Sequence, residues 1–167
     1  MITANMHLTC TNMEKDGDPI AAVKDALERA REGGIRNIVA LRGDPPHGEE
    51  EWKQTEGGFA CALDLVKYIR KEYGDEFGIA VAGYPEGHPN AITELKEGEE
   101  ANLTEAELAR CSHFEGKTYV CKEEDYKKEM IYLKEKVDAG AGKLFKNYGT
   151  IVMDGNSHRQ LFLTNLL

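Results

Sequence analysis

The sequence predicts an α/β protein whose strands run parallel in one sheet. Short apolar stretches of strand length alternate along the chain with longer stretches of helical periodicity. Strands that are apolar throughout indicate a sheet that is covered on both faces. Strictly alternating strands and helices give parallel pairing with right-handed crossovers. An open doubly wound sheet and part of a (β/α)8 barrel both satisfy this pattern.

The first strand and the first helix occupy the N-terminal part of the chain. Residues 5–11 (NMHLTCT) alternate apolar and polar side chains, which is typical of a short strand. Asp18 is expected to be the N-cap of the helix, with Pro19 as its first residue. The glycine pair 33–34 ends this helix, because glycine readily adopts the left-handed conformation found at helix C-termini.

Two further strands and one helix follow. Residues 37–41 (NIVAL) and 79–82 (IAVA) are apolar runs that predict the second and third strands. Residues 59–73 carry apolar side chains on one helical face, and Gly74 ends that helix. The residues on this face are Phe59, Leu63, Val66, Ile69 and Tyr73.

A long polar stretch from 84 to 125 separates the third strand from the last predicted helix. Within it, the sequence TEAE at Thr104 has the spacing of a capping box and predicts a short helix. The last predicted helix ends at Gly140, and its apolar face consists of Tyr126, Met130, Leu133 and Val137. Residues 142–167 are expected to form a tail of low order.

Composition disfavours several classes of partner. The chain has 30 acidic and 21 basic residues and a net charge of -9, which disfavours binding to nucleic acid and to anionic membranes. No apolar run reaches the roughly 20 residues that a membrane-spanning helix needs, and the first residues do not resemble a signal peptide. The four cysteines show no metal-site spacing, so we expect reduced thiols, no metal and a cytoplasmic location.

Polar side chains follow the ends of all three predicted strands. His7 lies on the first strand, residues 42–44 (RGD) follow the second, and Tyr84 and His88 follow the third. Ligands bind at the carboxyl ends of parallel strands, and arginine matches phosphate and carbonyl oxygens. We therefore expect a ligand site at this edge. The residues alone leave open a hydrolase or lyase that uses Asp44 as acid or base.

Five segments together resemble the catalytic domain of methylenetetrahydrofolate reductase in its eukaryotic form. These segments are MHLTCTNM (6–13), NIVALRGDPP (37–46), EGGFACALDLVKYIR (56–70), VAGYPEGHP (81–89) and YLKEKVDAGA (132–141). They match over about residues 5–141, in the family's order and spacing. The resemblance implies a partial (β/α)8 TIM barrel with parallel strands over residues 1–141, interrupted by an insertion at about 92–124. Residues 142–167 would then be a divergent tail.

The resemblance also implies a reaction of folate and one-carbon metabolism that serves methionine biosynthesis. NAD(P)H would reduce FAD, and the flavin would reduce 5,10-methylenetetrahydrofolate to 5-methyltetrahydrofolate. Asp44 would be catalytic and would contact the substrate, since a carboxylate stabilises the iminium cation that forms before hydride arrives. The implied FAD contacts are His7, Arg42, Gly43, Asp44, Cys61, Ala62, Tyr84, His88, Pro89, Asn90, Ala91, Glu129 and Lys136.

Several positions depart from the family pattern. Asn90 and Glu129 stand where glutamate and aspartate are more usual, and Cys61 stands where some relatives have tyrosine. The family's general acid, a glutamate on the first barrel strand, has no counterpart here. We therefore expect the chain alone to be marginally stable, to bind FAD weakly or not at all, and to reduce no folate. The alternative is a non-catalytic truncated isoform or ligand-binding module that pairs with a full-length subunit; homo-oligomerisation stays open.

Overall fold

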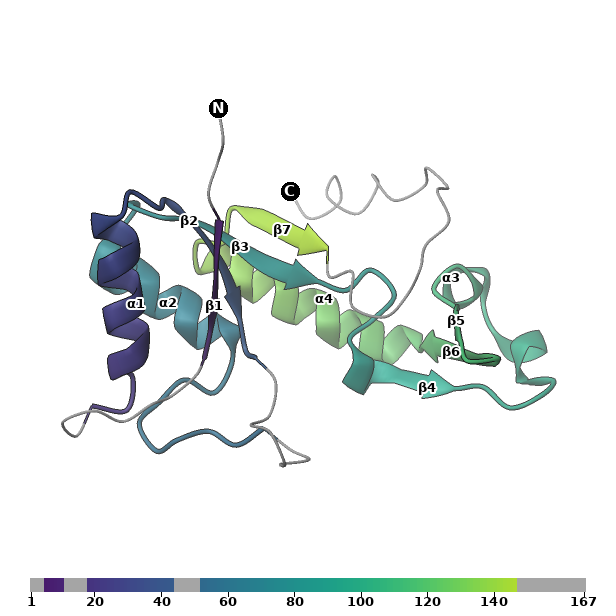
Figure 1. The fold of residues 1–167 in the computed structure, drawn as a ribbon. Helices are drawn as coiled ribbons and strands as arrows, with labels where there is room; N and C mark the ends of the chain where they lie inside the picture. Colours follow the sequence, from purple (N-terminus) through teal and green to yellow (C-terminus); the bar gives the residue numbers. More distant parts are fainter. Residues whose placement is uncertain (1–4, 11–17, 44–51, 147–167) are drawn as a thin grey trace. The chain divides into compact units, whose positions relative to one another are not determined.

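The structure is a computed structural model in which two compact units are distinguished (Figure 1). The residues that it describes are 5–10, 18–43 and 52–146. Among these, unit 1 contains the residues up to Ala82 and the segment Glu135–Phe145, and unit 2 contains Gly83–Lys134. Unit 1 is built around a parallel sheet, and unit 2 contains an antiparallel one.

The central sheet of unit 1 has the strand order β1-β2-β3-β7. β1 pairs with β2, and β2 pairs with β3, both in parallel register. This pairing confirms the predicted parallel α/β class. The strands are β1 (Asn5–Thr9), β2 (Asn37–Leu41), β3 (Gly78–Gly83) and β7 (Lys143–Lys146).

Two helices pack on one face of this sheet. α1 (Ala21–Glu32) contacts β1, and α2 (Ala62–Tyr73) contacts β2. Full burial of a large aliphatic side chain contributes roughly 1.5–3 kcal/mol each, so apolar packing is the main source of stability in this unit. Its fully buried side chains include Leu27, Ile38, Leu65, Ile69, Phe77 and Ile79.

Helix α1 begins later than the sequence predicts. Asp18 is not the N-cap, because Ile20 occupies that position. The Asp18 carboxylate instead accepts a hydrogen bond from the main-chain N–H of Ile20 at 3.0 Å. This contact spans two residues, as in an Asx turn, and competes with the helical conformation. The predicted end is confirmed, since Gly33 is the C-cap.

Helix α2 also begins later than predicted, at Ala62. Phe59 is buried, but it contributes to the core from the preceding loop, where its ring lies 5.2 Å from that of Tyr68. Apolar periodicity therefore extended the helix too far, because a buried loop residue can fall on the same helical face by chance. Gly74 ends the helix as expected.

Unit 2 contains a three-stranded antiparallel sheet that the sequence did not predict, with the order β4-β6-β5. Its strands are short and partly polar, so they lack the long alternating pattern that marks a strand. They fall within the insertion expected at about 92–124. The elements are β4 (Ile92–Glu94), the short helix α3 (Glu105–Leu108), β5 (Ser112–Phe114) and β6 (Lys117–Cys121). The capping box at Thr104 is confirmed.

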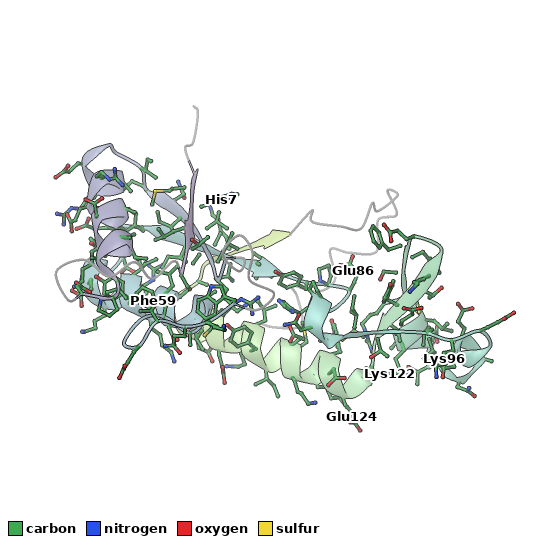
Figure 2. All side chains as sticks on the ribbon, turned by 60° about the horizontal axis from the view of Figure 1, so that its bottom comes forward. His7, Phe59, Glu86, Lys96, Lys122 and Glu124 are labelled. Atoms are coloured by element: carbon green, nitrogen blue, oxygen red, sulfur yellow. The ribbon has the colours of Figure 1, made fainter. Side chains whose placement is uncertain are left out.

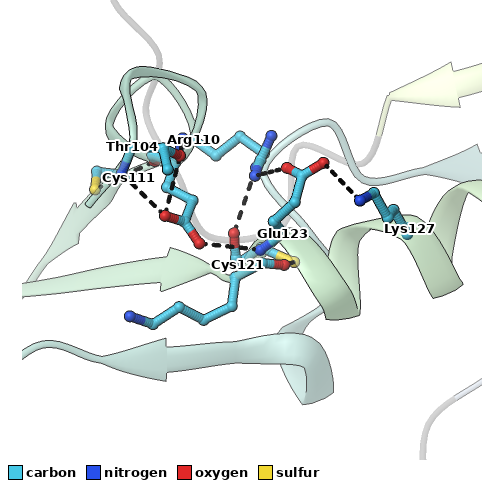
Figure 3. A network of polar contacts seen from close by, with 8 residues as sticks. Thr104, Arg110, Cys111, Cys121, Glu123 and Lys127 are labelled. Atoms are coloured by element: carbon cyan, nitrogen blue, oxygen red, sulfur yellow. Dashed lines mark hydrogen bonds and ion pairs between the residues drawn. The ribbon is translucent and has the colours of Figure 1, made fainter. Parts of the chain in front are cut away.

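A buried polar network joins α3, β6 and the first turn of α4 (Glu123–Asp138) (Figure 3). The Glu107 carboxylate accepts hydrogen bonds from the N–H and hydroxyl of Thr104, each at 3.0 Å, and from the N–H of Glu123 at 3.1 Å. Arg110 donates to the Cys121 carbonyl and to Glu123, and its guanidinium group lies 4.2 Å from the Tyr126 ring centroid. These contacts fix the start of α4.

The other end of α4 is fixed by Arg70 in unit 1. Its guanidinium group donates twice to the Gly140 carbonyl, at 3.1 and 2.7 Å, and also to the carbonyls of Gly74 and Phe77. One side chain thus satisfies acceptors beyond the ends of both α2 and α4. The predicted stop at Gly140 is confirmed, since α4 ends at Asp138.

Strand β7 (Lys143–Lys146) lies within residues 142–167, which were expected to be a tail of low order. The N–H of Gly142 donates to the Ile79 carbonyl at 2.9 Å, so this stretch joins the sheet beside β3. Residues 147–167 lie outside the described residues, and the expected low order of the tail stays a prediction for them.

Candidate functional site

The carboxyl ends of β1 and β2 lie level with each other, because Thr9 pairs with Leu41 in register. The N–H of Cys10 donates to the carbonyls of Leu41 and Arg42, at 3.0 and 3.1 Å. Main-chain contacts therefore hold the ends of these two strands together in unit 1, and the ligand site expected at this edge stays a prediction.

Gly43 lies against Thr9 at this edge. Its φ is +90°, and a Cβ added there would lie 3.0 Å from the Cβ of Thr9. Any other residue would face both the unfavourable φ and this contact. Glycine at this position therefore lets the main chain after β2 pack directly against Thr9.

Arg42 supplies a permanent positive charge at the same edge. Its side chain is exposed, and the guanidinium carbon lies 5.8 Å from the ring centroid of Trp52. This distance is within the range of a cation–π interaction. The interaction restrains the Arg42 side chain but does not use the N–H donors of the guanidinium group. Trp52 was not among the predicted site residues, although an aromatic ten residues after the arginine is visible in the sequence.

Figure 2 labels His7 on β1. The alternation of side chains along a strand puts His7 on the face opposite to the buried side chains Leu8 and Cys10. It is exposed and aligned with Val39 of β2. Thr9 shares this face, since side chains alternate along a strand. The structure therefore places His7 and Thr9 on the face of the sheet opposite to the buried side chains of β1.

Cys61 and Ala62 form the start of α2, with Cys61 half-buried as the N-cap and Ala62 buried. The Asp64 carboxylate accepts a hydrogen bond from the Ala60 N–H at 3.0 Å. Burial raises the pKa of the Cys10 thiol to about 12, and the neighbouring Cys61 and Asp64 add to this shift. Cys10 is therefore a neutral core residue rather than a nucleophile.

The turn after β3 holds the predicted residues of unit 2. The rings of Tyr84 and His88 meet edge to face, with centroids 4.7 Å apart and planes at 70°. His88 caps the 3-10 turn Pro89–Ala91 (η1), because its Nδ1 accepts a hydrogen bond from the Asn90 N–H at 3.1 Å. Five predicted positions, from Tyr84 to Ala91, thus lie in one short segment.

Gly87 explains how this turn is placed on the rest of unit 2. Its φ is +102°, and a Cβ added there would lie 2.5 Å from the Cβ of Cys121 on β6. Only glycine fits without a shift of the neighbouring strand. Gly87 is part of the segment VAGYPEGHP (81–89). Its contact with Cys121, 34 residues later in the sequence, has no signal in that segment.

Glu129 and Lys136 both lie on α4, seven residues or two helical turns apart. Glu129 is half-buried and belongs to unit 2, whereas Lys136 is buried and belongs to unit 1. Lysine is rarely buried to this extent without a specific role. Asp44, the predicted catalytic residue, lies outside the described residues, and its role stays a prediction.

Neither a bilayer span nor a metal cluster is found in the part of the chain that the structure describes. No helix there is long and apolar enough to cross a membrane. No group of three or more His, Cys, Asp or Glu side chains there is arranged to hold a metal ion. All four cysteines are free thiols.

These observations define a parallel α/β protein with charged, aromatic and glycine residues at the carboxyl ends of its strands, the usual position of a ligand site in this class. The sequence model of the family described as methylenetetrahydrofolate reductase matches residues 1–146. The chain belongs to the methylenetetrahydrofolate reductase family. Its sheet is accordingly part of the family's TIM barrel, and the match extends five residues beyond the expected limit of 141.

Curated relatives from several eukaryotes are similar over most of this chain. Methylenetetrahydrofolate reductase (NADH) 1 of Zea mays is 45% identical over 163 residues, which cover 95% of this chain and 23% of the relative. The protein of the same name from Arabidopsis thaliana is 50% identical over 136 residues, covering 81% and 18%. Methylenetetrahydrofolate reductase 2 of Saccharomyces cerevisiae is 44% identical over 135 residues, covering 81% and 17%. The chain thus spans less than a quarter of these relatives.

Proposed function

We propose that this chain is the cofactor-binding part of a flavin-dependent methylenetetrahydrofolate reductase. In this proposal NAD(P)H reduces FAD, and the flavin reduces 5,10-methylenetetrahydrofolate to 5-methyltetrahydrofolate. The observation that carries the proposal is the edge at which Arg42 and Gly43 follow β2 and lie beside β1. This edge occurs in a chain whose family is named for that reduction.

The residues present fit a flavin nucleotide. Gly43 lets the main chain after β2 pack directly against Thr9, which keeps the ends of the two strands close together beneath the proposed site. The Arg42 guanidinium group can donate to phosphate or carbonyl oxygens. Tyr84 and His88, whose rings meet edge to face within unit 2, are further proposed contacts of FAD. The bound flavin would supply the hydride chemistry, while these residues bind and orient it.

Asp44 and Lys136 have distinct roles in this proposal. Asp44 follows Gly43 directly in the sequence, and its carboxylate would stabilise the cationic form of the folate substrate. Lys136 would balance negative charge of the cofactor, and Glu129 would contact the cofactor from the same helix. The further contacts proposed for FAD are His7, Cys61, Ala62, Pro89, Asn90 and Ala91.

The chain alone is proposed to bind FAD weakly and to complete no reduction. The parallel sheet of the described residues has the four strands β1, β2, β3 and β7, whereas a closed barrel needs eight. A sheet that is not closed leaves strand edges unpaired and reduces the contacts that hold a site rigid. We further propose that the chain, whose four cysteines are free thiols, acts in the cytoplasm, where thiols stay reduced.

Titration of the purified chain with FAD, followed by flavin fluorescence, tests the binding proposal. Arg42→Met is compared with Arg36→Met, because both arginines are exposed and lie just beyond opposite ends of β2. Arg36 donates to the carbonyl of Arg31 in the last turn of α1 and to that of Ile35 beside it. The proposal predicts that Arg42→Met weakens FAD binding at least about tenfold, as expected for loss of a charge-assisted hydrogen bond. Arg36→Met should leave binding unchanged.

A turnover assay on the same samples completes the test. The chain is supplied with FAD, NADH or NADPH and 5,10-methylenetetrahydrofolate, and the product is identified by mass spectrometry. Equal FAD affinity in both arginine variants would refute the assignment of the edge. Formation of 5-methyltetrahydrofolate by the chain alone would refute the proposed inactivity but support the family reaction. A ligand-binding module that pairs with a longer subunit would also bind FAD without turnover. Co-purification of the chain with such a subunit would identify that alternative.

A further inference from the structure

Lys136 lies in the last turn of α4 and is only 6% exposed. A buried ammonium group interacts strongly with other charges, and the strength of this interaction depends on the distance between them. The main-chain contacts that place the end of α4 therefore decide which charges Lys136 can reach. These contacts lie within unit 1.

Helix α4 ends in a Schellman motif that includes Lys136. The N–H of Gly140 donates to the carbonyl of Val137 at 2.9 Å, and the N–H of Ala141 donates to the carbonyl of Lys136 at 3.0 Å. Gly140 has a φ of +110°, and this motif places a glycine with positive φ at that position. The main chain of Lys136 is thus tied to the residues that follow the helix.

Two contacts attach this motif to the sheet and to α2. The N–H of Gly142 donates to the Ile79 carbonyl of β3 at 2.9 Å. The carbonyl of Gly140 accepts hydrogen bonds from Nε and Nη2 of Arg70 on α2, at 3.1 and 2.7 Å. The residues after α4 therefore link Arg70, Lys136 and β3.

The guanidinium group of Arg70 is itself held in one orientation. Its Nη1 donates to the carbonyls of Gly74 and Phe77, each at 2.8 Å, so the planar group donates from two of its edges at once. Gly140 lies so close that a Cβ added there would be 2.5 Å from Nε of Arg70. A guanidinium group fixed in this way cannot shift without releasing the end of α4.

We propose that Arg70 is a positioning residue, which places Lys136 by holding the Gly140 carbonyl. Arg70 does not touch the ligand in this proposal, because it acts through the end of α4. The role of Lys136 toward the cofactor rests on the proposed function, whereas the placement of Lys136 by Arg70 rests on the contacts within unit 1.

Side-chain NMR spectra of the chain without FAD test this placement. The two Hε protons of a lysine have separate resonances when the side chain is fixed, and they average when it moves freely among rotamers. We expect separate Hε resonances for Lys136 in the wild type and a single one in Arg70→Met. Asp75→Asn is the control, since it removes only an exposed carboxylate 3.9 Å from Nη1 of Arg70, and the resonances should stay separate. A single resonance in the wild type, or separate resonances in Arg70→Met, would overturn the proposal.

Gly140→Ala tests the same link from the other side, because its Cβ would push Nε of Arg70 away from the Gly140 carbonyl. Gly34→Ala is the matched control. Gly34 follows α1 in the same motif, with a φ of +75° and no neighbour within 4 Å of an added Cβ. Exchange of the Ala141 amide should accelerate in Gly140→Ala, and the Lys136 resonances should merge, whereas the Ile35 amide should stay protected in Gly34→Ala. If Arg70→Met does not fold, this pair decides, and an unchanged Lys136 signal in Gly140→Ala would overturn the proposal.

A double-mutant cycle on FAD affinity separates positioning from a general loss of stability. Lys136→Met should weaken binding about tenfold, as expected for loss of a charge-assisted contact, and Arg70→Met should weaken it about fivefold, within the range for coupled residues. In the Lys136→Met background, Arg70→Met should cause almost no further loss, whereas in the Arg42→Met background its full effect should persist. Losses that multiply in the Lys136→Met background would overturn the proposal.

The failure of the proposed function has a different signature. If the wild type does not bind FAD while Arg70→Met merges the Lys136 resonances, flavin binding is refuted and the placement of Lys136 by Arg70 stands. If FAD binds but the Lys136 resonances do not respond to Arg70→Met, flavin binding stands and the positioning role is refuted. Thermal unfolding of each variant shows whether a loss of affinity reflects a loss of folding.

Discussion

Unit 1 and unit 2 are held together by different kinds of interaction. In unit 1 the largest fully buried side chains are apolar and lie between the parallel sheet and its helices, with Leu27, Ile38 and Ile69 among them. In unit 2 the carboxylate of Glu107 and the guanidinium group of Arg110 are buried beside the antiparallel sheet. Packing stabilises the first unit, whereas a network of charged groups joins the elements of the second.

This difference has a consequence for how each unit responds to change. A cavity in an apolar core lowers the free energy of unfolding, but the contribution of apolar packing depends little on pH. A buried charged network depends on each partner, because every unpaired buried group costs free energy. The two units should therefore be sensitive to different substitutions and different conditions.

The largest effect is expected from a cavity in unit 1. Ile69 is fully buried on α2, so Ile69→Ala should lower the free energy of unfolding by about 2–5 kcal/mol. Trp52 is the single tryptophan of the chain and lies in unit 1, so its fluorescence in urea follows this unit. Val137→Ala is the control in the same unit, since Val137 is 39% exposed, and it should change stability by less than about 0.5 kcal/mol.

The next largest loss of stability is expected for a substitution at Gly87 in unit 2. A comparison with Gly98 separates the cost of a steric clash from the cost of an unfavourable φ. Gly87→Ala should cost at least about 2 kcal/mol, because a Cβ there meets Cys121 and φ is +102°. Gly98→Ala has a φ of +85° but no neighbour within 4 Å, so only the cost of about 1 kcal/mol for φ is expected. Hydrogen exchange at the Val120 amide measures both. Equal costs would show that Gly87 is not tightly packed on β6.

Removal of the buried cation of unit 2 should have a smaller effect than the cavity in unit 1. Arg110→Met eliminates the hydrogen bonds to Glu123 and the Cys121 carbonyl, which should cost about 1–3 kcal/mol. Lys117→Met is the control, because Lys117 pairs with Glu94 at the surface and such pairs contribute about 0–1 kcal/mol. If the two variants were equally stable, the network would not be what joins the elements of unit 2.

The smallest effect is a pH dependence that Glu107 should confer on unit 2. Hydrogen bonds from the N–H groups of Thr104 and Glu123 hold the pKa of this carboxyl below its ordinary value of 4.5. Since folding lowers the pKa, its contribution is complete above about pH 4.5 and is lost as the pH falls through the folded-state pKa. Glu107→Gln should therefore be less stable than the wild type near neutral pH, with a difference that narrows in acid. A difference independent of pH would contradict this account.

Much of unit 1 could be predicted from the sequence, because its signals are strong. The apolar runs 37–41 and 79–82 gave two strands, and the glycines after α1 and α2 gave the helix ends. The helix starts were wrong by two or three residues, since Asp18 forms a local turn and Phe59 is buried from a loop. The sheet of unit 2 escaped prediction because its strands have three to five residues and are stabilised by pairings that sequence spacing does not show.

The candidate site was predicted in part. Arg42 and Gly43 follow β2, and His7 lies within β1 opposite Val39. The residues from Tyr84 to Ala91 lie in one short segment, and the roles of all these residues stay predictions. The packing of Arg42 on Trp52 and the capping of Asn90 by His88 depend on side-chain contacts in three dimensions. Neither has a sequence motif, so neither could be predicted.

Hydrogen exchange of the main-chain amides with and without FAD tests most directly whether the carboxyl edge of the sheet holds the flavin. The account predicts that FAD slows exchange at this edge, in peptides that contain Cys10 and Gly43. Exchange at the amino edge of the same strands, around Asn37 and Gly78, should stay unchanged. Protection at the amino edge, or no protection in either place, would contradict the account.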